Sequence, residues 1–206
     1  MKILAINGSH RKGKCCGDLL NIALNAAKAD DMETELIELP DYNITYCSAC
    51  NKCLMNKTCS IEDDMQVIEA KMKEADGIIM GSPDYFSNVS ARMKTFIDRT
   101  RYLHMVENQL KGKVAGIVTV AGLNNCGIEP TVDVLERFFV THEMLIVHPR
   151  PEGPVLGTGT TGSTMGGFRE DGRIQWRRSI TEDVIAVKFA EQLGKDMASL
   201  VKRLSA

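Results

Sequence analysis

The sequence lacks several features that would assign a chain to a function class at once. Its formal net charge is only −2 over 206 residues, so no basic field is present to hold a nucleic acid backbone or an anionic membrane surface. No apolar run approaches the roughly 20 residues that a membrane-spanning helix needs. The apolar part of the N-terminal stretch MKILAINGSH is too short for a secretory signal. These absences predict a cytoplasmic protein that binds neither nucleic acid nor membrane.

Two common catalytic arrangements are also missing from the sequence. Neither a Ser–His–Asp set nor a pair of carboxylates with an obvious shared role can be recognised. His104, His142 and His148 are isolated and are expected to be structural or solvated. His10 lies in the first loop, where it could touch a ligand, but we expect it to have no required role. No catalytic side chain is therefore predicted, and the chemistry is expected to come from bound cofactors.

Short apolar runs alternate with helical patterns along the whole chain. The runs are KILAI, TELIEL, DGIIMG, KVAGIVTV and EMLIVH, and the last helical pattern covers about residues 181–204. Continuously apolar strands that alternate with helices predict an α/β fold with a parallel sheet that is covered on both faces. Five such strands match the smaller doubly wound fold with strand order 2-1-3-4-5. Its ligand lies beyond the carboxyl ends of strands one and three.

The loop after the first run, GSHRKGKCC, is predicted to bind phosphate. Backbone N–H groups of a strand-to-helix turn and the following helix N-terminus together form an anion site. The hydroxyl of Ser9 can donate a hydrogen bond, and the guanidinium of Arg11 can pair with phosphate oxygens. The alternative is that this stretch is only a solvated basic turn.

Two nucleotide-binding patterns in the chain do not fit their own contexts. Gly8, Gly13 and Lys14 satisfy G-x-x-x-x-G-K, but Cys15 stands where Ser or Thr should hold Mg²⁺, and a thiol is a poor ligand for that hard ion. A formal G-x-G-x-x-G is present in a Gly- and Thr-rich tract with no strand before it and no clear helix after it. Its glycines are Gly157, Gly159 and Gly162. We therefore expect neither a nucleoside triphosphate nor a dinucleotide.

The loop after the third run, GSPDYFSNVSARMKTFIDR, should face the same ligand as the first loop. Pro83 stiffens the turn, Tyr85 and Phe86 offer aromatic surface, and the next three residues present backbone amides. A flat heteroaromatic ring would use both features, stacking on the aromatic surface and accepting N–H donors along its edge. The alternative is that both aromatic residues only pack on the core. Together with a third loop, VAGLNNCG, these features favour flavin mononucleotide (FMN) as the ligand.

The motifs INGSHRKG, GSPDYFSNVSARMKTFIDR and C-x2-C-x2-C-x5-C-x-I-x-D-D-M resemble those of a known family. The chain resembles the NAD(P)H-dependent FMN reductases of flavodoxin-like fold and, more narrowly, the iron–sulfur flavoproteins of anaerobic archaea and bacteria. The resemblance covers roughly residues 1–148. The chain departs from the family pattern at Cys15 and Cys16, where small polar residues are commoner in the family. This departure puts the side-chain phosphate contacts there in doubt. The residues that the resemblance implies around FMN are Ser9, Arg11, Cys16 and Gly17 at the phosphate, Pro83, Tyr85, Phe86, Ser87, Asn88 and Val89 at the isoalloxazine, and Ala121 and Gly122 on the third loop.

Four of the seven cysteines, Cys47, Cys50, Cys53 and Cys59, lie in one short stretch. A tight C-x2-C-x2-C run with a fourth cysteine elsewhere is typical of iron–sulfur ligation, and it favours a [4Fe–4S] cluster. Zinc is the first alternative, but zinc sites usually pair C-x2-C units across a longer spacer. Thiols without a ligand, or redox-active thiols, are the second alternative. The odd cysteine total fits a disulfide framework poorly.

Asp63 and Asp64 follow the cysteine segment at the start of a predicted helix. Acidic residues favour helix N-termini, so we expect no more than this local role. The segment 149–179 is Gly- and Thr-rich and too long for a simple connection. It is expected to be irregular, serving as an interface arm, a flavin lid or a surface loop.

The sequence thus predicts one domain over 1–206, with a cysteine loop at 46–60 and an insertion at 149–179. The function we expect is transfer of electrons from a ferredoxin-like donor through a [4Fe–4S] cluster and FMN to a small-molecule or protein acceptor. The resemblance implies a homotetramer in which the cluster of one subunit lies near the flavin of another; a homodimer is the smaller alternative. The other hypotheses are an NAD(P)H-dependent flavin or quinone reductase without a cluster, and a zinc-stabilised binding module on the same scaffold.

Overall fold

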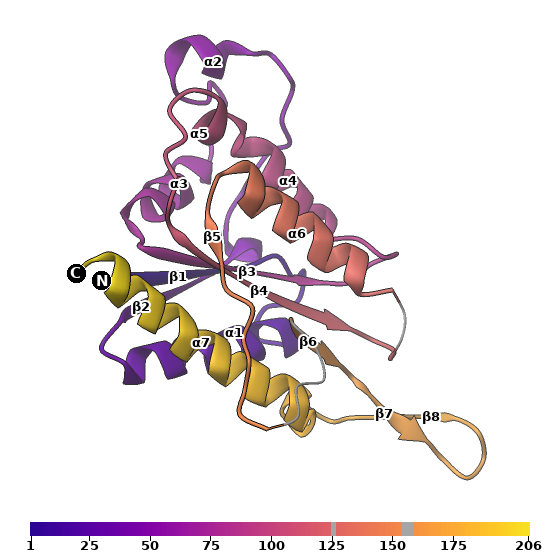
Figure 1. The fold of residues 1–206 in the computed structure, drawn as a ribbon. Helices are drawn as coiled ribbons and strands as arrows, with labels where there is room; N and C mark the ends of the chain where they lie inside the picture. Colours follow the sequence, from indigo (N-terminus) through magenta and orange to yellow (C-terminus); the bar gives the residue numbers. More distant parts are fainter. Residues whose placement is uncertain (125–126, 154–158) are drawn as a thin grey trace.

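The computed structural model describes residues 1–124, 127–153 and 159–206 and shows one parallel sheet between two layers of helices (Figure 1). The sheet has the order β2-β1-β3-β4-β5, which confirms the predicted doubly wound, flavodoxin-like order, and a further strand, β6, also pairs with β4. Its strands are β1 (Lys2–Asn7), β2 (Glu33–Glu38), β3 (Gly77–Pro83), β4 (Val114–Ala121), β5 (Leu145–Ile146) and β6 (Thr160–Ser163).

The three central strands are apolar because helices cover both of their faces. All eight residues of β4 are buried, as are all residues of β3 except the last. Strand β2 lies at the sheet edge, and only its last two residues are buried. The run TELIEL is accordingly the most polar of the five, as a strand at the edge of a parallel sheet allows.

Each face of the sheet is covered by its own set of helices. The helices α1 (Cys15–Ala29) and α7 (Val184–Leu204) lie together on one face, with the short turn η2 (Ile180–Glu182) before α7. Gly194 lets the two helices approach closely, because a Cβ there would lie 2.0 Å from the carbonyl oxygen of Ala23. The other face is covered by α3 (Met65–Glu74), α4 (Ala91–Arg99), α5 (Arg101–Met105) and α6 (Glu129–Thr141).

The prediction that 149–179 is irregular was wrong for part of the segment. It contains β6 and an antiparallel hairpin, β7 (Met165–Phe168) with β8 (Ile174–Trp176), which extends away from the body of the fold (Figure 1). The predicted fifth strand, 143–148, is reduced to the two residues of β5. Strand β4 pairs with β5 through Val114 and Ala115 and with β6 through its last four residues, so two short strands share the fifth position.

The loops that follow β1, β3 and β4 all leave the same edge of the sheet, since parallel strands present their carboxyl ends together. The cysteine segment leaves β2 through the turn η1 (Leu39–Asp41) and contains the short helix α2 (Lys52–Asn56). Figure 1 places α2 beyond α5, at the opposite end of the molecule from the β7–β8 hairpin. Within the described residues, no helix is long and apolar enough to cross a membrane.

Candidate functional site

The first loop is shaped by side chains at the ends of β1 and β2. Asn7 donates from Nδ2 to Oε2 of Glu38 at 2.7 Å and accepts at Oδ1 from the Ser9 N–H at 3.0 Å. The other oxygen of Glu38 accepts from the Gly13 N–H at 3.3 Å, and Gly13 itself has a φ of +58°, which suits glycine. The Ser9 hydroxyl also accepts from the N–H of Arg11 at 3.1 Å. The loop therefore has a fixed shape that does not depend on a ligand.

The first and second loops are tied to each other as well. The N–H of Gly8 donates to the carbonyl of Gly81 at 2.7 Å, and the hydroxyl of Ser90 donates to the carbonyl of Gly8 at 2.5 Å. The same Ser90 oxygen caps α4 by accepting from the Met93 N–H at 3.0 Å. A Cβ on Gly8 would lie 2.7 Å from Cβ of Met93, so only glycine fits at this position.

The second loop turns sharply after β3. Phe86 and Ser87 adopt the left-handed region with φ values of 54° and 55°, a conformation that is uncommon away from glycine. The Tyr85 N–H donates to the carbonyl of Asn88 at 2.9 Å across this turn. The Tyr85 ring stacks on that of His10, with the ring centres 6.0 Å apart and the planes 8° from parallel. An aromatic side chain of the first loop thus lies parallel to one of the second loop.

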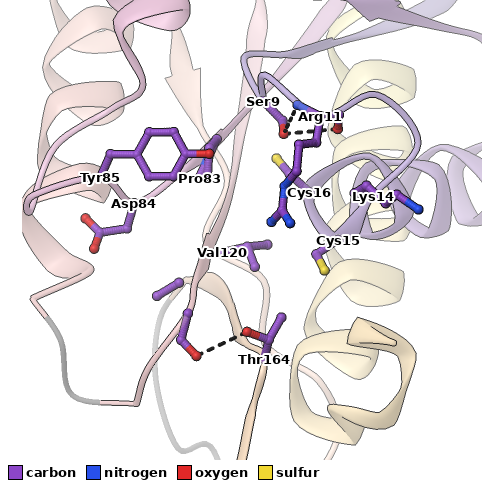
Figure 2. Close-up of a pocket in the computed structure, with 12 residues that line it drawn as sticks. Ser9, Arg11, Lys14, Cys15, Cys16, Pro83, Asp84, Tyr85, Val120 and Thr164 are labelled. Atoms are coloured by element: carbon purple, nitrogen blue, oxygen red, sulfur yellow. Dashed lines mark hydrogen bonds between the residues drawn. The ribbon is translucent and has the colours of Figure 1, made fainter. Parts of the chain in front are cut away.

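A pocket opens between these loops and the end of β4 (Figure 2). Of the twelve predicted FMN-binding residues, the pocket is lined by Ser9, Arg11, Cys16, Pro83, Tyr85, Ala121 and Gly122. The remaining lining residues were not predicted to bind FMN. They are Lys14, Cys15, Asp84, Val120 and Thr164. The side chain of Arg11 extends into the space below Ser9, whereas that of Lys14 points away from it.

The other predicted FMN-binding residues do not line this pocket. Gly17 lies against the Glu38 and Asn7 side chains, from which a Cβ would be only 3.0 and 3.1 Å away. Val89 is buried in the core, while the Phe86 side chain is fully exposed. The remaining two residues of the second loop, Ser87 and Asn88, form the turn itself. Their contact with a flavin stays a prediction.

Thr164 comes from the segment predicted to be irregular. Its hydroxyl donates to the carbonyl of Gly122 at 3.1 Å and so joins the end of β6 to the third loop (Figure 2). Residues 125 and 126 of the predicted third loop, and Gly157 of the G-x-G-x-x-G pattern, lie outside the described residues. No sequence signal pointed to Thr164, because TTGS lacks the apolar run that identified the other strands.

The pocket can hold an anion beside an aromatic surface. Arg11 supplies a cation next to the backbone N–H groups of the first loop, and Tyr85 supplies a ring on the opposite wall. Burial raises the pKa of the Cys16 thiol well above its usual range, so this thiol stays protonated. It packs near Gly81, where a Cβ would lie 3.0 Å from its sulfur. Cys16 is therefore a packing residue at the floor of the site.

The cysteine segment forms a second candidate site away from this pocket. Cys53 lies on α2, and the other three predicted ligands lie in the irregular stretches around it. Burial raises the pKa of the Cys53 thiol, and repulsion from Cys59 and, more weakly, from Cys47 adds to this increase. Cys50 is exposed, and its sulfur lies 3.6 Å from the Ser60 hydroxyl.

The four cysteines form no disulfide in the structure and would supply thiol ligands, which suit iron–sulfur clusters and zinc. Among the residues that the structure describes, no three or more His, Cys, Asp or Glu side chains are arranged closely enough to hold a metal ion. The donor chemistry therefore fits a sulfur-ligated metal centre, and Cys50 is the most exposed of the four predicted ligands.

The base of the cysteine segment is held by a buried ion pair. Arg99, at the end of α4, contacts Asp63 through two hydrogen bonds, with Nη1–Oδ2 at 2.6 Å and Nη2–Oδ1 at 2.9 Å. Asp63 also accepts from the N–H groups of Thr45 and Met65 at 2.8 and 3.1 Å. The prediction that Asp63 has only a local role was wrong. It accepts from the first residue of α3 but also joins two segments that are distant in sequence.

The fold and the pocket together define a flavodoxin-like α/β protein with an anion-binding loop at the point where the strand order reverses. The sequence profile of the NADPH-dependent FMN reductase family matches residues 1–150. The iron–sulfur flavoprotein MJ1083 of Methanocaldococcus jannaschii is 39% identical over 203 residues, which cover 98% of each chain. An iron–sulfur flavoprotein of Archaeoglobus fulgidus is 36% identical over 202 residues, covering 98% of this chain and 96% of the relative. The chain belongs to the iron–sulfur flavoproteins within the NADPH-dependent FMN reductase family.

Solved structures agree on the fold. A flavone reductase superposes with a TM-score of 0.71 at 20% identity, covering 100% of this chain and 64% of the other. A WrbA-like flavodoxin from Agrobacterium tumefaciens gives a TM-score of 0.61 at 14% identity, covering 98% and 97%. Taken with the family, these findings define the chain as a flavin-dependent oxidoreductase or electron-transfer protein.

Proposed function

We propose that the protein transfers electrons between a ferredoxin-like donor and an acceptor through a [4Fe–4S] cluster and FMN. The observation that carries this proposal is the presence of two separate sites on one chain. One is a preformed anion pocket with an aromatic wall, and the other is a loop that carries four cysteines. Relatives named iron–sulfur flavoproteins match this chain over nearly its whole length, which supports the same pairing here.

The FMN phosphate would be held by the first loop. Arg11 supplies the charge, and backbone N–H groups between Ser9 and the start of α1 supply donors. The flavin ring would lie on the wall formed by Pro83 and Tyr85, with Ala121 and Gly122 opposite, because these residues line the same pocket.

The cluster would be held by Cys47, Cys50, Cys53 and Cys59. When bound, it would supply one-electron steps, which FMN can combine into a two-electron step. The protein contributes the thiols, a turn-rich loop around them, and nearby cations. Arg101 partly offsets the increase in the pKa of Cys53 and holds the loop by donating to Oδ1 of Asn51 at 2.7 Å.

Electron transfer between the two sites is proposed to run between subunits. Figure 1 shows α2 beyond α5, away from the strand ends that form the pocket. The β7–β8 hairpin extends from the opposite end and exposes 68% of Phe168 and 52% of Trp176. Exposed aromatic residues on a projecting hairpin suit a subunit contact. A homodimer or homotetramer would bring the cysteine loop of one subunit to the pocket of another.

A flavin or quinone reductase without a cluster is the second candidate. It is favoured by the open arrangement of the cysteines among the described residues. It is also favoured by a probable NAD(P)H dehydrogenase (quinone) of Arabidopsis thaliana, which is 34% identical over 149 residues, covering 68% of this chain and 51% of the relative. In this candidate NAD(P)H would reduce the flavin directly.

The absorption spectrum of protein purified without oxygen separates the candidates. The proposal predicts flavin peaks above a broad iron–sulfur shoulder. Flavin peaks alone would support the reductase, and a colourless protein that contains zinc would support a zinc-stabilised binding module. Mixing with a reduced ferredoxin should bleach the shoulder before the flavin peaks if the cluster is the entry point.

A further inference from the structure

Arg99 occupies an unusual position for an arginine, since its side chain is fully buried at the base of the cysteine loop. The exposed fractions of the Arg99 and Asp63 side chains are 0% and 3%. Removing two such groups from water is costly, and only close pairing and further hydrogen bonds compensate for it. The free-energy cost of burying this ion pair must therefore be offset by its contacts with the surrounding chain.

The contacts of Arg99 join both ends of the cysteine loop. Nη1 donates to the carbonyl of Thr45 at 2.6 Å as well as to Asp63, and the Asp63 carboxylate accepts from the Thr45 N–H. Thr45 precedes the first cysteine and Asp63 follows the last, 18 positions further along the chain. A single guanidinium thus closes the loop that carries all four cysteines.

Arg99 keeps its charge in this buried position. Burial alone would lower the pKa of Arg99, but the hydrogen bonds and the charge of Asp63 raise it. Nε of the same guanidinium is buried and has no hydrogen-bond partner among the described residues. The guanidinium is therefore a buried cation whose counter-charge is Asp63.

We propose that Arg99 is a positioning residue for the cysteine loop, which it closes at its base by joining Thr45 to Asp63. Its role in cluster binding rests on the function proposed above. Closing the base limits the conformations open to the loop, so less conformational entropy is lost when the four thiols bind iron and sulfide.

The test compares variants of the full-length protein that has been reconstituted with iron and sulfide. Arg99→Met removes the charge and the donors, Arg99→Lys keeps the charge, and Asp63→Asn leaves the arginine without its counter-charge. Lys94→Met is the matched control, because Lys94 lies on the same helix in an exposed ion pair with Asp98. Iron and acid-labile sulfide per bound flavin give the occupancy of the cluster.

We expect Arg99→Met to hold at least several-fold less iron per bound flavin than wild type when iron and sulfide are limiting, because an open loop must order more of its chain to gather the four thiols. Asp63→Asn should lose iron as well, Arg99→Lys should keep more iron than Arg99→Met, and Lys94→Met should match wild type. Full iron content in Arg99→Met, or equal loss of iron and flavin in both Arg99 variants, overturns the proposal.

Limited proteolysis of cluster-free protein separates this inference from the function on which it rests. Without iron, Arg99→Met should still increase cleavage within 46–62 at least several-fold over wild type and over Lys94→Met, because the base of the loop opens. If wild type holds no cluster yet this difference is seen, the proposed function fails and loop closure by Arg99 stands. Equal cleavage in all three proteins refutes loop closure.

Discussion

The first loop and the cysteine loop differ in how far the protein alone fixes their shape. In the first loop, Asn7 and Ser9 are buried, and Glu38 connects the loop to the neighbouring strand. In the cysteine loop most residues between 43 and 62 are exposed, and Ala49 and Asn51 adopt the left-handed region without being glycine. One loop is preorganised, while the other is held mainly at its base.

This difference has a physical consequence for the ligands. A preorganised anion site loses little conformational entropy when phosphate binds. A loop with few internal contacts needs the energy of metal–thiolate bonds to order it, so metal binding and loop ordering are coupled. Flavin binding should therefore tolerate changes in the cysteine loop, whereas the metal content should depend on each cysteine.

The largest expected effect comes from removing one thiol. Cys50→Ala should abolish most iron binding while the flavin content stays near one per chain, because the two sites share no residue. Iron analysis and the absorption spectrum measure both quantities in one sample. Cys15→Ala is the matched control, because Cys15 is a thiol outside the cysteine loop, and this variant should keep its iron. Full iron content in Cys50→Ala would contradict the ligand assignment.

Acid should lower the stability of the fold that supports both loops. Burial, with a smaller effect of His104, lowers the pKa of His142 from 6.5 to about 4, so His142 is neutral when folded. Its contribution to stability is complete above pH 6.5 and is lost as the pH falls towards 4, at about 1.4 kcal/mol per pH unit, or roughly 3 kcal/mol in total. Urea unfolding at several pH values should show a flatter dependence on pH in His142→Gln than in wild type. An unchanged slope in His142→Gln would show that other groups cause the acid sensitivity.

A change of charge in the first loop should affect the flavin alone. Arg11→Met should weaken FMN binding by about 1.5 kcal/mol, or about tenfold, because one charge-assisted hydrogen bond to phosphate is lost. Lys12→Met is the control, since Lys12 lies in the same loop but pairs with Asp41 on the surface at 2.5 Å. Fluorescence quenching on titration with FMN gives both affinities. Equal losses in the two variants would mean that only the overall charge of the loop matters.

The smallest effects test the backbone of each loop. Gly13 and Ala49 have φ values of 58° and 54°. Gly13→Ala should cost about 1 kcal/mol of stability, because the fixed loop cannot relax. Ala49→Gly should change stability by less than about 0.5 kcal/mol, since relief of strain and the greater freedom of the unfolded chain nearly cancel. Thermal unfolding measures both changes, and a large loss in Ala49→Gly would show that the cysteine loop is fixed as well.

Much of the fold could be predicted because buried strands need continuous apolar runs. The runs at β1, β3 and β4 met this condition. Strand β6 could not be found in this way, because its Gly162 lies against Ala186, Ile180 and Leu19 side chains, where a Cβ would be only 3.1 Å away. A strand pressed so closely against its neighbours uses small residues, and its sequence then looks like a loop.

Residues of the candidate site could be predicted from the sequence when they directly follow a predicted strand. Arg11 and Tyr85 meet because parallel strands end at one edge, which the strand order already implies. The Asp63–Arg99 pair could not be predicted, because its two residues are 36 positions apart in two separate motifs, and neither motif indicates that it packs against the other. Their pairing depends on how α4 packs beneath the cysteine loop, and only the structure shows this.

The most direct test of the account is the content of iron and acid-labile sulfide in native protein prepared without oxygen. A bound [4Fe–4S] cluster predicts about four iron atoms and four sulfides per chain, alongside one flavin. Flavin without iron or sulfide would contradict the central claim.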